Sequence, residues 1–183
     1  MKHVIPYFIA FGLVVTLLLG CSMQQNTAKS RWWHAFNTRY NVYYNGSVAY
    51  IDGALEKEQG NKDNFTEIIP LYTVGNKSSR ELGKANFDKA IKKSEKAIQL
   101  HSIKRRPIWD KNRRKTERDI EWLNRREYNP FLWKVWLMMG KAQFHQGAFE
   151  EAASTFSYMS RLYQTQPSIY GKARAWLAKT YVE

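Results

Sequence analysis

The feature that most constrains the fold of this 183-residue chain is a stretch near its C-terminal end where small and aromatic residues recur at helical spacing. Asn129 and Pro130 open this stretch as an expected N-cap and first helical residue, because the first turn of a helix does not need the N–H that proline lacks. Gly147 marks an expected turn, so the pattern predicts a helix hairpin. The small residues Gly140 and Ala152 would let the two helices approach closely. The rings of Phe149 and Phe156 would fill the space beside that contact.

This spacing, which starts at Trp136, resembles the tetratricopeptide repeat, in which Trp and Leu-Gly precede a glycine turn, and an aromatic residue, Ala and Phe follow it. Gln143 stands where the consensus has tyrosine, and Gln164 stands where the closing proline is expected, with Pro167 three residues later. The segment from Phe87 to Ala97 resembles a second half-repeat. The resemblance implies an all-α chain of antiparallel helix hairpins stacked as a solenoid, and it implies nothing about a ligand.

We assign residues 128–183 to this repeat and to the first helix of a further one. After Pro167, three residues fit such a first helix, Leu177, Ala178 and Tyr181. A first helix without its hairpin partner leaves an apolar face open, whereas solenoids normally end in a polar cap. The sequence is therefore either the N-terminal part of a longer array or ends in an atypical cap.

The N-terminus has the pattern of a bacterial lipoprotein leader. Lys2 and His3 precede an apolar run over residues 4–19, which is shorter than the roughly 20 residues of a membrane-spanning helix and suits a signal peptide. Aliphatic and small residues stand directly before Cys21, the only cysteine of the chain. We expect a signal peptide over residues 1–20, acylation of Cys21, including palmitate, and a polar tether over 21–30. An uncleaved signal anchor with an incidental cysteine is the alternative.

Residues 31–127 are expected to form an N-terminal helical, repeat-like region. Its aromatic block over 31–50 puts five rings near one helical face, and Asn45-Gly46-Ser47 predicts a turn between two antiparallel helices. We expect the rings to pack in the core; an aromatic patch at the bilayer interface is the alternative. The pattern also predicts a short helix over 64–69, a helix capped by Asn86, and a polar helix over 110–127.

Positive charge is concentrated in one segment. The chain carries a formal net charge of +13, and residues 104–126 hold ten Lys or Arg against four acids. Such a block is typical of surfaces that bind nucleic acid, anionic lipid or an acidic protein. Nucleic acid is excluded for an exported protein, which meets no chromosome. A solvated helix face and a docking surface for a partner or for phosphate head groups remain.

No catalytic or metal-binding pattern is present in the sequence. The three histidines that would remain after processing, His34, His101 and His145, are far apart and have no acidic or cysteine ligands at metal spacing. No serine lies in a Gly-x-Ser-x-Gly elbow. We therefore expect a binding protein that is not an enzyme and that uses no metal, cofactor or small-molecule substrate.

Four segments, residues 36–46, 89–104, 127–132 and 140–147, carry a closer resemblance. They resemble the N-terminal part of the PorW/SprE lipoproteins of the type IX secretion and gliding motility machinery of Bacteroidetes. The resemblance covers almost all of the mature chain, and family members are longer, with further repeats. It implies an outer-membrane lipoprotein that faces the periplasm, has no enzymatic activity and binds protein subunits of the secretion apparatus.

The expected function is therefore an outer-membrane-anchored periplasmic scaffold for protein–protein interactions in type IX secretion and gliding motility. The alternative is a periplasmic repeat lipoprotein in outer-membrane protein assembly or in the regulation of cell-wall enzymes. Candidate partner contacts on the first helix of the hairpin are Trp133, Lys134, Trp136 and Lys141. A basic stretch made of Arg113, Arg114 and Lys115 would steer an acidic partner electrostatically. The sequence leaves open which subunit binds, which of the two surfaces it contacts, and the oligomeric state.

Overall fold

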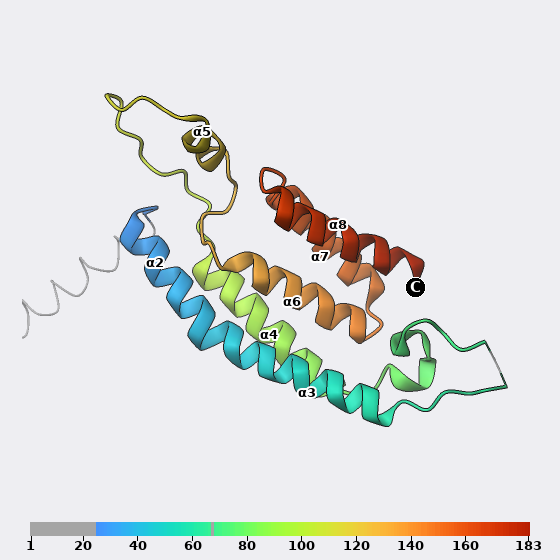
Figure 1. Ribbon diagram of the computed structural model, residues 1–183. Coiled ribbons are helices and arrows are strands. Elements are labelled where there is room, and N and C mark those ends of the chain that lie inside the picture. Colours follow the sequence, from blue (N-terminus) through green and yellow to red (C-terminus); the bar gives the residue numbers. More distant parts are fainter. Residues whose placement is uncertain (1–24, 67) are drawn as a thin grey trace, which may run out of the picture.

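The computed structural model describes residues 25–66 and 68–183 of the chain. Within these residues the fold is all-α and contains no strand, which confirms the predicted class (Figure 1). Six helices pack in antiparallel order when the continuous helix formed by residues 28–60 is counted as one. In the described part of the chain, no helix combines the length and the apolar character that a membrane span requires. The expected signal peptide and Cys21 lie outside the described residues.

The first element is a continuous helical rod built of α2 (Ala28–Asn37), the π-helical segment η2 (Thr38–Tyr43) and α3 (Tyr44–Gly60). The predicted turn at Asn45-Gly46-Ser47 is wrong. The Asn45 side chain donates to the carbonyl of Asn41 at 2.6 Å, and the Ser47 hydroxyl donates to the carbonyl of Tyr44 at 2.8 Å. Both polar side chains are thus satisfied inside the helix, so neither competes with it.

Most rings of the aromatic block face solvent, so the predicted core packing is wrong for them. Trp32 is 64% exposed and Tyr40 is 56% exposed, and Trp33, Phe36 and Tyr44 are exposed as well. The rings of Trp32, Phe36 and Tyr40 form a ladder, with centroids 5.5 Å and then 4.9 Å apart. Tyr43, by contrast, is partly buried and packs edge-on against Phe131.

The connection from the rod to the next helix contains two short 3-10 turns, η3 (Thr73–Gly75) and η4 (Lys77–Ser79). The predicted helix over 64–69 is absent from its described residues: Asn64 accepts a hydrogen bond from the N–H of Thr66 at 3.1 Å, which closes a local turn instead. Buried Lys57 of the rod donates its ammonium group to the carbonyl of Ser79 and holds the connection against α3. Burial lowers the pKa of Lys57.

Helix α4 (Lys84–His101) runs antiparallel to the rod. It begins after Gly83, whose backbone has a φ of 72° and lies against the backbone of Gly53, so only glycine fits there. The predicted cap, Asn86, is wrong, because this residue lies inside the first turn and its amide donates to Glu56 at 3.3 Å. The helix buries one face, made of Phe87, Ala90, Ser94 and Ala97.

The predicted polar helix over 110–127 is shorter in the structure. Helix α5 (Glu117–Leu123) starts at a capping box between Thr116 and Asp119, which satisfies the backbone N–H groups at both positions. Its expected apolar stripe is thin, since Leu123 is buried and Ile120 is exposed. The basic residues before it, 104–116, lie outside regular helix.

The predicted hairpin is confirmed as α6 (Leu132–His145) and α7 (Phe149–Leu162), with a turn at Gly147 in the left-handed region. A Cβ at Gly140 would lie 2.5 Å from the ring of Phe156, so glycine is needed for the close helix contact. Helix α6 begins two residues later than predicted, and Asn129 accepts the N–H of Phe131 at 3.0 Å. Helix α8 (Pro167–Val182) follows, with Pro167 in its first turn as expected.

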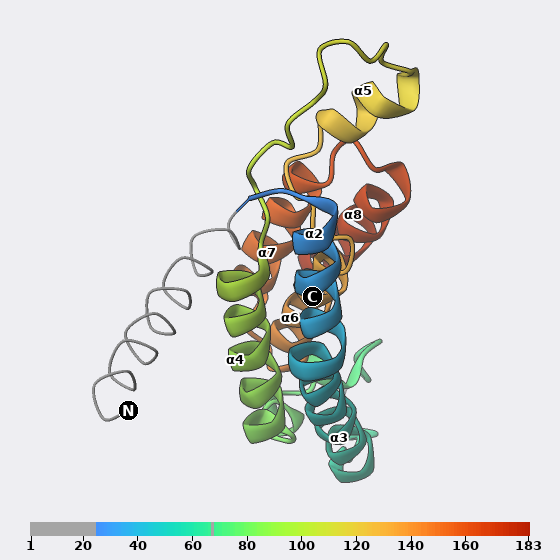
Figure 2. The same cartoon turned by 90° about the vertical axis from the view of Figure 1, so that its left-hand side faces the viewer.

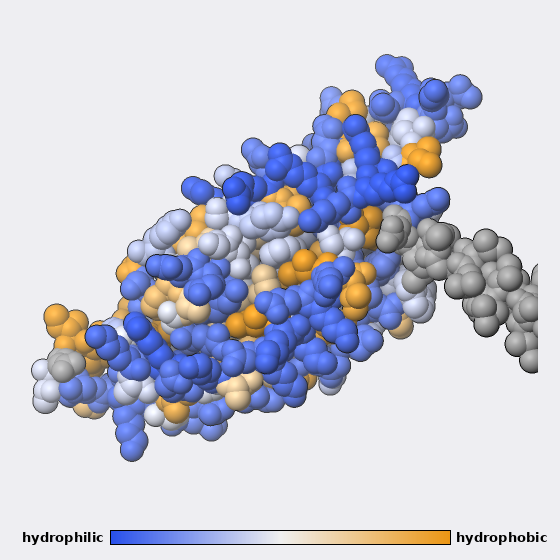
Figure 3. Space-filling view, turned by 180° about the vertical axis from the view of Figure 1, so that it is seen from behind, coloured by the Kyte–Doolittle hydropathy of each residue, from blue (hydrophilic) through white to orange (hydrophobic). Residues whose placement is uncertain are grey.

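The helices form two layers. Helices α3, α6 and α8 contact one another in order and run in the same direction, while α4 and α7 pack between them in the opposite direction. Figure 2 shows α3 and α8 on one side of the stack and α4 and α7 on the other. The face seen from behind in Figure 3 is largely hydrophilic with small apolar patches. The largest buried apolar side chains are Phe87, Leu132, Phe144, Phe156, Met159 and Tyr163.

A buried polar junction ties the rod, the end of α4 and the start of α6 together. The carboxylate of Glu127, 2% exposed, accepts N–H groups from Ile103 at 2.8 Å and Asn129 at 2.9 Å. The amide of Asn129 donates to the Thr38 hydroxyl at 3.0 Å and to the carbonyl of His101 at 2.9 Å. These bonds join residues up to 91 positions apart and fix how the hairpin meets the rod.

Candidate binding groove

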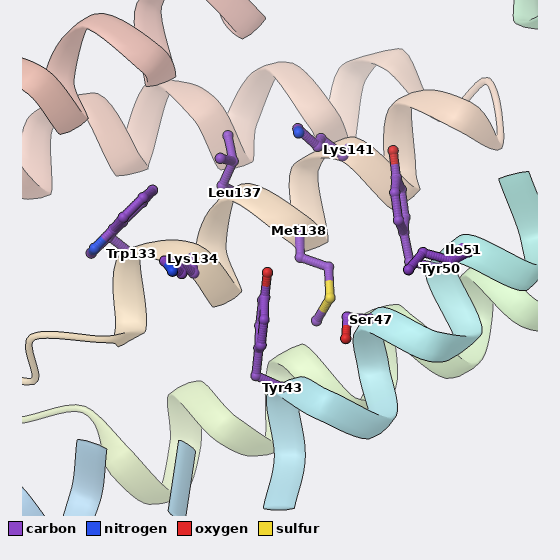
Figure 4. Close-up of a pocket in the computed structure, with 9 residues that line it drawn as sticks. All are labelled: Tyr43, Ser47, Tyr50, Ile51, Trp133, Lys134, Leu137, Met138 and Lys141. Carbon is purple, nitrogen blue, oxygen red and sulfur yellow. The ribbon is translucent and has the colours of Figure 1, made fainter. Parts of the chain in front are cut away.

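A groove lies between the rod and α6 and encloses a cavity of about 340 Å³ (Figure 4). Its lining is mainly aromatic and aliphatic, with two lysines. Four lining residues come from the rod and five from α6: Tyr43, Ser47, Tyr50, Ile51, Trp133, Lys134, Leu137, Met138 and Lys141. Residues three, four and seven apart on a helix share a face, which is how α6 presents Lys134, Leu137, Met138 and Lys141 together.

The apolar part of the groove is held in place by the core beneath it. In Figure 4, Tyr43 and Tyr50 stand on the rod and point toward α6, with Met138 between them. The ring of Tyr50 packs against Phe87 and His145, at 5.9 Å and 5.8 Å between centroids. This burial raises the pKa of the Tyr50 hydroxyl to about 12. Gly46 allows Met138 to reach the rod, because a Cβ there would lie 2.7 Å from its methyl group.

Two lysines of α6 line the groove. Lys134 and Lys141 are seven residues apart, which corresponds to about 10.5 Å along a helix. The ammonium group of Lys134 lies 4.9 Å from the centre of the Phe131 ring and 5.6 Å from that of Trp133. That of Lys141 lies 4.9 Å from the Trp176 ring of α8. Each is thus held over an aromatic face by a cation–π contact.

Helix α8 adds a second lysine to each of these tryptophans. Lys172 lies 5.6 Å from the Trp133 ring. Lys179 lies 4.7 Å from the Trp176 ring and 3.6 Å from the Tyr72 ring. We call the first group, Lys134, Trp133 and Lys172, the Trp133 clamp, and the second, Lys141, Trp176 and Lys179, the Trp176 clamp.

The four clamp lysines have no carboxylate within ion-pair distance among the described residues, whose two ion pairs lie elsewhere. Burial, and then the neighbouring charge of Lys179, lowers the pKa of Lys141. Burial also lowers the pKa of Lys179, and Glu183 opposes this shift. Uncompensated positive charge beside apolar surface favours a ligand that is anionic and partly apolar.

Three of the sequence-predicted contact residues, Trp133, Lys134 and Lys141, come together in this groove. Trp136 does not line it; its ring packs on Tyr158 of α7 with centroids 4.9 Å apart, and its indole N–H is buried without a hydrogen-bond partner in the described part of the chain. The lipidation candidate Cys21 lies outside the described residues.

The basic stretch lies apart from the groove, in the loop that leads to α5 at one end of the helical stack (Figure 1). Arg113, Arg114 and Lys115 are all exposed. The guanidinium of Arg113 lies 4.8 Å from the Trp109 ring centre and 3.7 Å from the Asp119 carboxylate. Arg114 and Lys115 take part in neither of the ion pairs found among the described residues.

Sequence reasoning missed the rod side of the groove, namely Tyr43 and Tyr50, and the α8 residues that contact its α6 side, namely Lys172, Trp176 and Lys179. The seven-residue spacing from Lys172 to Lys179 repeats that from Lys134 to Lys141 and is a signal that the sequence does contain. The approach of Tyr43 and Tyr50 to α6 has no such signal, because it depends on how the rod meets the hairpin.

Two histidines that are distant in the sequence meet in the structure. The Nδ1 atoms of His34 and His101 are 3.0 Å apart, and burial, followed by the charge of His34, lowers the pKa of His101. Across residues 25–66 and 68–183, no three histidine, cysteine or acidic side chains gather in a way that would hold a metal ion.

In comparisons with known proteins, no family model matches the chain, and neither does any curated protein.

Proposed function

We propose that this chain is an outer-membrane-anchored periplasmic scaffold of the tetratricopeptide type, which holds protein subunits of the type IX secretion and gliding motility machinery. The observation that carries the proposal is the groove between the rod and α6. It joins three of the sequence-predicted contact residues to an apolar floor, and its two lysines, Lys134 and Lys141, form no ion pair among the described residues.

The arrangement of helices supports the repeat assignment. In a solenoid of helix hairpins, the first helices of successive repeats line one side of the stack and the second helices line the other. Here α3, α6 and α8 contact one another in order, and α4 and α7 alternate with them. The contact of Gly140 with Phe156, and the burial of Ala152, match the small and large positions of the repeat.

The anchor is the second part of the proposal. Acylation of Cys21 would tie the helical stack to the membrane through the tether over 21–30, because two or three acyl chains hold a protein firmly at a bilayer without a spanning helix. The groove would then present its lysines to subunits that reach the periplasmic face.

The test is co-purification from detergent-solubilised envelopes of cells that make the protein, followed by mass spectrometry. The native chain is compared with Cys21→Ala and with the groove variant Lys134→Glu/Lys141→Glu. A matched control, Lys92→Glu/Lys96→Glu, makes the same charge change on the exposed side of α4. We expect type IX components to accompany the native chain and the control, and to decrease with the other two variants. Recovery of outer-membrane assembly or cell-wall proteins instead would overturn the proposal.

A further inference from the structure

The rod carries a continuous apolar stripe on the side that faces away from the other helices. Its buried residues, among them Val42 and Ala49, pack against α4 and α6. Residues two positions away lie on the opposite side, because each residue turns a helix by about 100°. Figure 1 shows the rod along the lower left edge of the stack. Seven apolar side chains, each between 41% and 62% exposed, follow its outer side, and we call them the outer stripe: Trp33, Phe36, Tyr40, Tyr44, Val48, Ile51 and Leu55.

The outer stripe is symmetric about its middle residue, Tyr44. Going outward, its members form pairs at four, at seven or eight, and at eleven residues from Tyr44: Tyr40 and Val48, Phe36 and Ile51, Trp33 and Leu55. Two exposed charged residues continue the same face at its ends, Lys29 and Glu58, which are fifteen and fourteen residues from Tyr44. Neighbours in this series are three or four residues apart, which keeps them on one side of the helix.

The two halves of the rod differ in size and in charge. The outer stripe is aromatic up to Tyr44 and aliphatic after it. The exposed charged residues of the rod are basic before Tyr44 and acidic after it, namely Lys29 and Arg39, then Asp52, Glu56 and Glu58. Neither Lys29 nor Glu58 belongs to an ion pair among the described residues. The halves are therefore complementary to one another and not to themselves.

We propose that the outer stripe is a homodimer interface, in which the rod of a second copy packs antiparallel across a two-fold axis at Tyr44. In a two-fold interface the same patch serves both copies, so a residue on one side of the axis meets its counterpart from the other side. Each aromatic half would then meet an aliphatic half, and Lys29 would face Glu58 at both ends. A parallel pair would instead place rings on rings and like charges on like charges, which is unfavourable.

The space and the area on the rod fit this occupant. Beside the aromatic half lies a cavity of about 340 Å³, whose lining includes Trp32, Phe36 and Tyr40 and which aliphatic side chains of the second copy would enter. A buried ring contributes 150–250 Å², so the half-exposed rings offer roughly 100 Å² each. With the aliphatic side chains and Trp32, the apolar area is roughly 700 Å² per copy, close to the 800 Å² or so of a specific interface.

A bilayer fits the outer stripe less well. Helices that lie in a membrane interface are rich in Lys and Arg on their polar side. The aliphatic half of the rod has exposed Asp52, Glu56 and Glu58 instead, and its one lysine, Lys57, is buried. The inference goes beyond the proposed function and does not depend on it, because a scaffold for any partner could be a dimer.

The experiment is disulfide cross-linking of the purified full chain in mild detergent. Each variant carries a single new cysteine and Cys21→Ala, so that no other cysteine is present. A disulfide requires Cα atoms within about 7 Å. Tyr44→Cys lies on the two-fold axis and should link two copies at micromolar concentration. Tyr40→Cys and Val48→Cys, each about 12 Å from its own counterpart, should link at least about tenfold more slowly alone. A mixture of these two variants should link them to each other.

The end charges give a second test, by sedimentation in the same detergent. Glu58→Lys should weaken the dimer about three- to tenfold, since each dimer contains the pair twice, and Lys29→Glu/Glu58→Lys should restore it. The matched control, Glu95→Lys, makes the same change in charge on the exposed side of α4 and should leave the dimer intact. The outer stripe is exposed in the dilute monomer, so these variants should change association and keep the circular dichroism spectrum.

Three results would overturn the inference. Equal cross-linking at positions 40, 44 and 48 would mean random collision, and faster cross-linking at position 40 than at position 44 would mean a parallel pair. A cysteine at position 44 that stays monomeric, and is shielded from a water-soluble thiol reagent only when phosphatidylglycerol vesicles are added, would mean that a bilayer covers the stripe. Because the proposed function is tested by envelope partners of the groove, either proposal can fail while the other stands.

Discussion

At the scale of single residues, the contact between Gly140 and Phe156 decides how closely α6 and α7 pack. A methyl group at position 140 would lie 2.5 Å from a ring that is fully buried and stacked on Trp176, so the ring has no free space to move into. We expect Gly140→Ala to lower the free energy of unfolding by about 1–2 kcal/mol, because overpacking outweighs the gain in helix propensity.

Gly171 supplies the matched control, since it lies inside α8 and a Cβ there would meet no atom within 4 Å. Gly171→Ala should raise the free energy of unfolding by about 0.5–1 kcal/mol. Urea denaturation of both variants measures the two effects. An unchanged midpoint for Gly140→Ala would show that the helices do not depend on this contact.

His145 makes stability depend on pH. Its ring stacks on Phe87 and lies near three lysines, and burial together with the charges of Lys179, Lys57 and Lys141 lowers its pKa to about 4. The unfolded chain, with a histidine pKa of about 6.5, therefore binds more protons between pH 6.5 and pH 4. Stability should be full above pH 6.5 and decrease as the pH falls, by about 2 kcal/mol at pH 5 from this residue.

The measurement is the free energy of unfolding at pH 7 and at pH 5 for the native chain and His145→Phe, which keeps a ring in the aromatic cluster. The variant should lose less stability on acidification. The stability of the variant should still depend on pH, because the pKa of His101 is also lowered. Identical pH dependence in the two proteins would contradict this account.

At the scale of elements, the rod carries an aromatic ladder that contributes little to the core. Trp32 and Phe36 are exposed, whereas Phe87 of α4 is fully buried against the rod. Trp32→Ser/Phe36→Ser should change the free energy of unfolding by no more than about 0.5 kcal/mol per residue, while Phe87→Ala should cost about 3–5 kcal/mol. Urea denaturation tests this directly, and a large loss for the serine variant would mean that the ladder is covered in the folded protein.

The elements differ in how far the sequence predicts them, for physical reasons. The α6–α7 hairpin is predictable because Gly140, Gly147 and Ala152 mark a close helix contact and a turn at fixed spacing. The sequence predicts two helices where the structure has one rod, because Asn45 and Ser47 are turn residues by preference, yet here their side chains bond to carbonyls within their own helix. Local preference did not reveal that a π segment would carry the helix through this region.

At the scale of the whole molecule, the groove depends on contacts between distant segments, which explains why only its α6 side was predicted. Trp133, Lys134 and Lys141 are predicted as contacts from their place on the first helix of the hairpin. Tyr43 and Tyr50 reach α6 because Asn129 and Glu127 lock the start of the hairpin to the rod and to α4. Those buried bonds join residues between 24 and 91 positions apart, so spacing within one helix cannot predict them.

The basic loop is a second positive surface, and its part in binding is separable from that of the groove. Arg113, Arg114 and Lys115 are exposed outside regular helix, so reversing them to glutamate should leave the fold intact. If this loop steers an acidic partner, the triple variant should slow association and weaken partner capture, and added salt should reduce the difference from the native chain.

The control is Lys89→Glu/Lys92→Glu/Lys96→Glu, which makes the same change in charge on the exposed side of α4. Partner capture from envelopes at low and high salt, with circular dichroism of each variant, measures the effect. Unchanged capture with a normal spectrum would remove the loop from the binding mechanism and leave the groove as the surface that holds the partner.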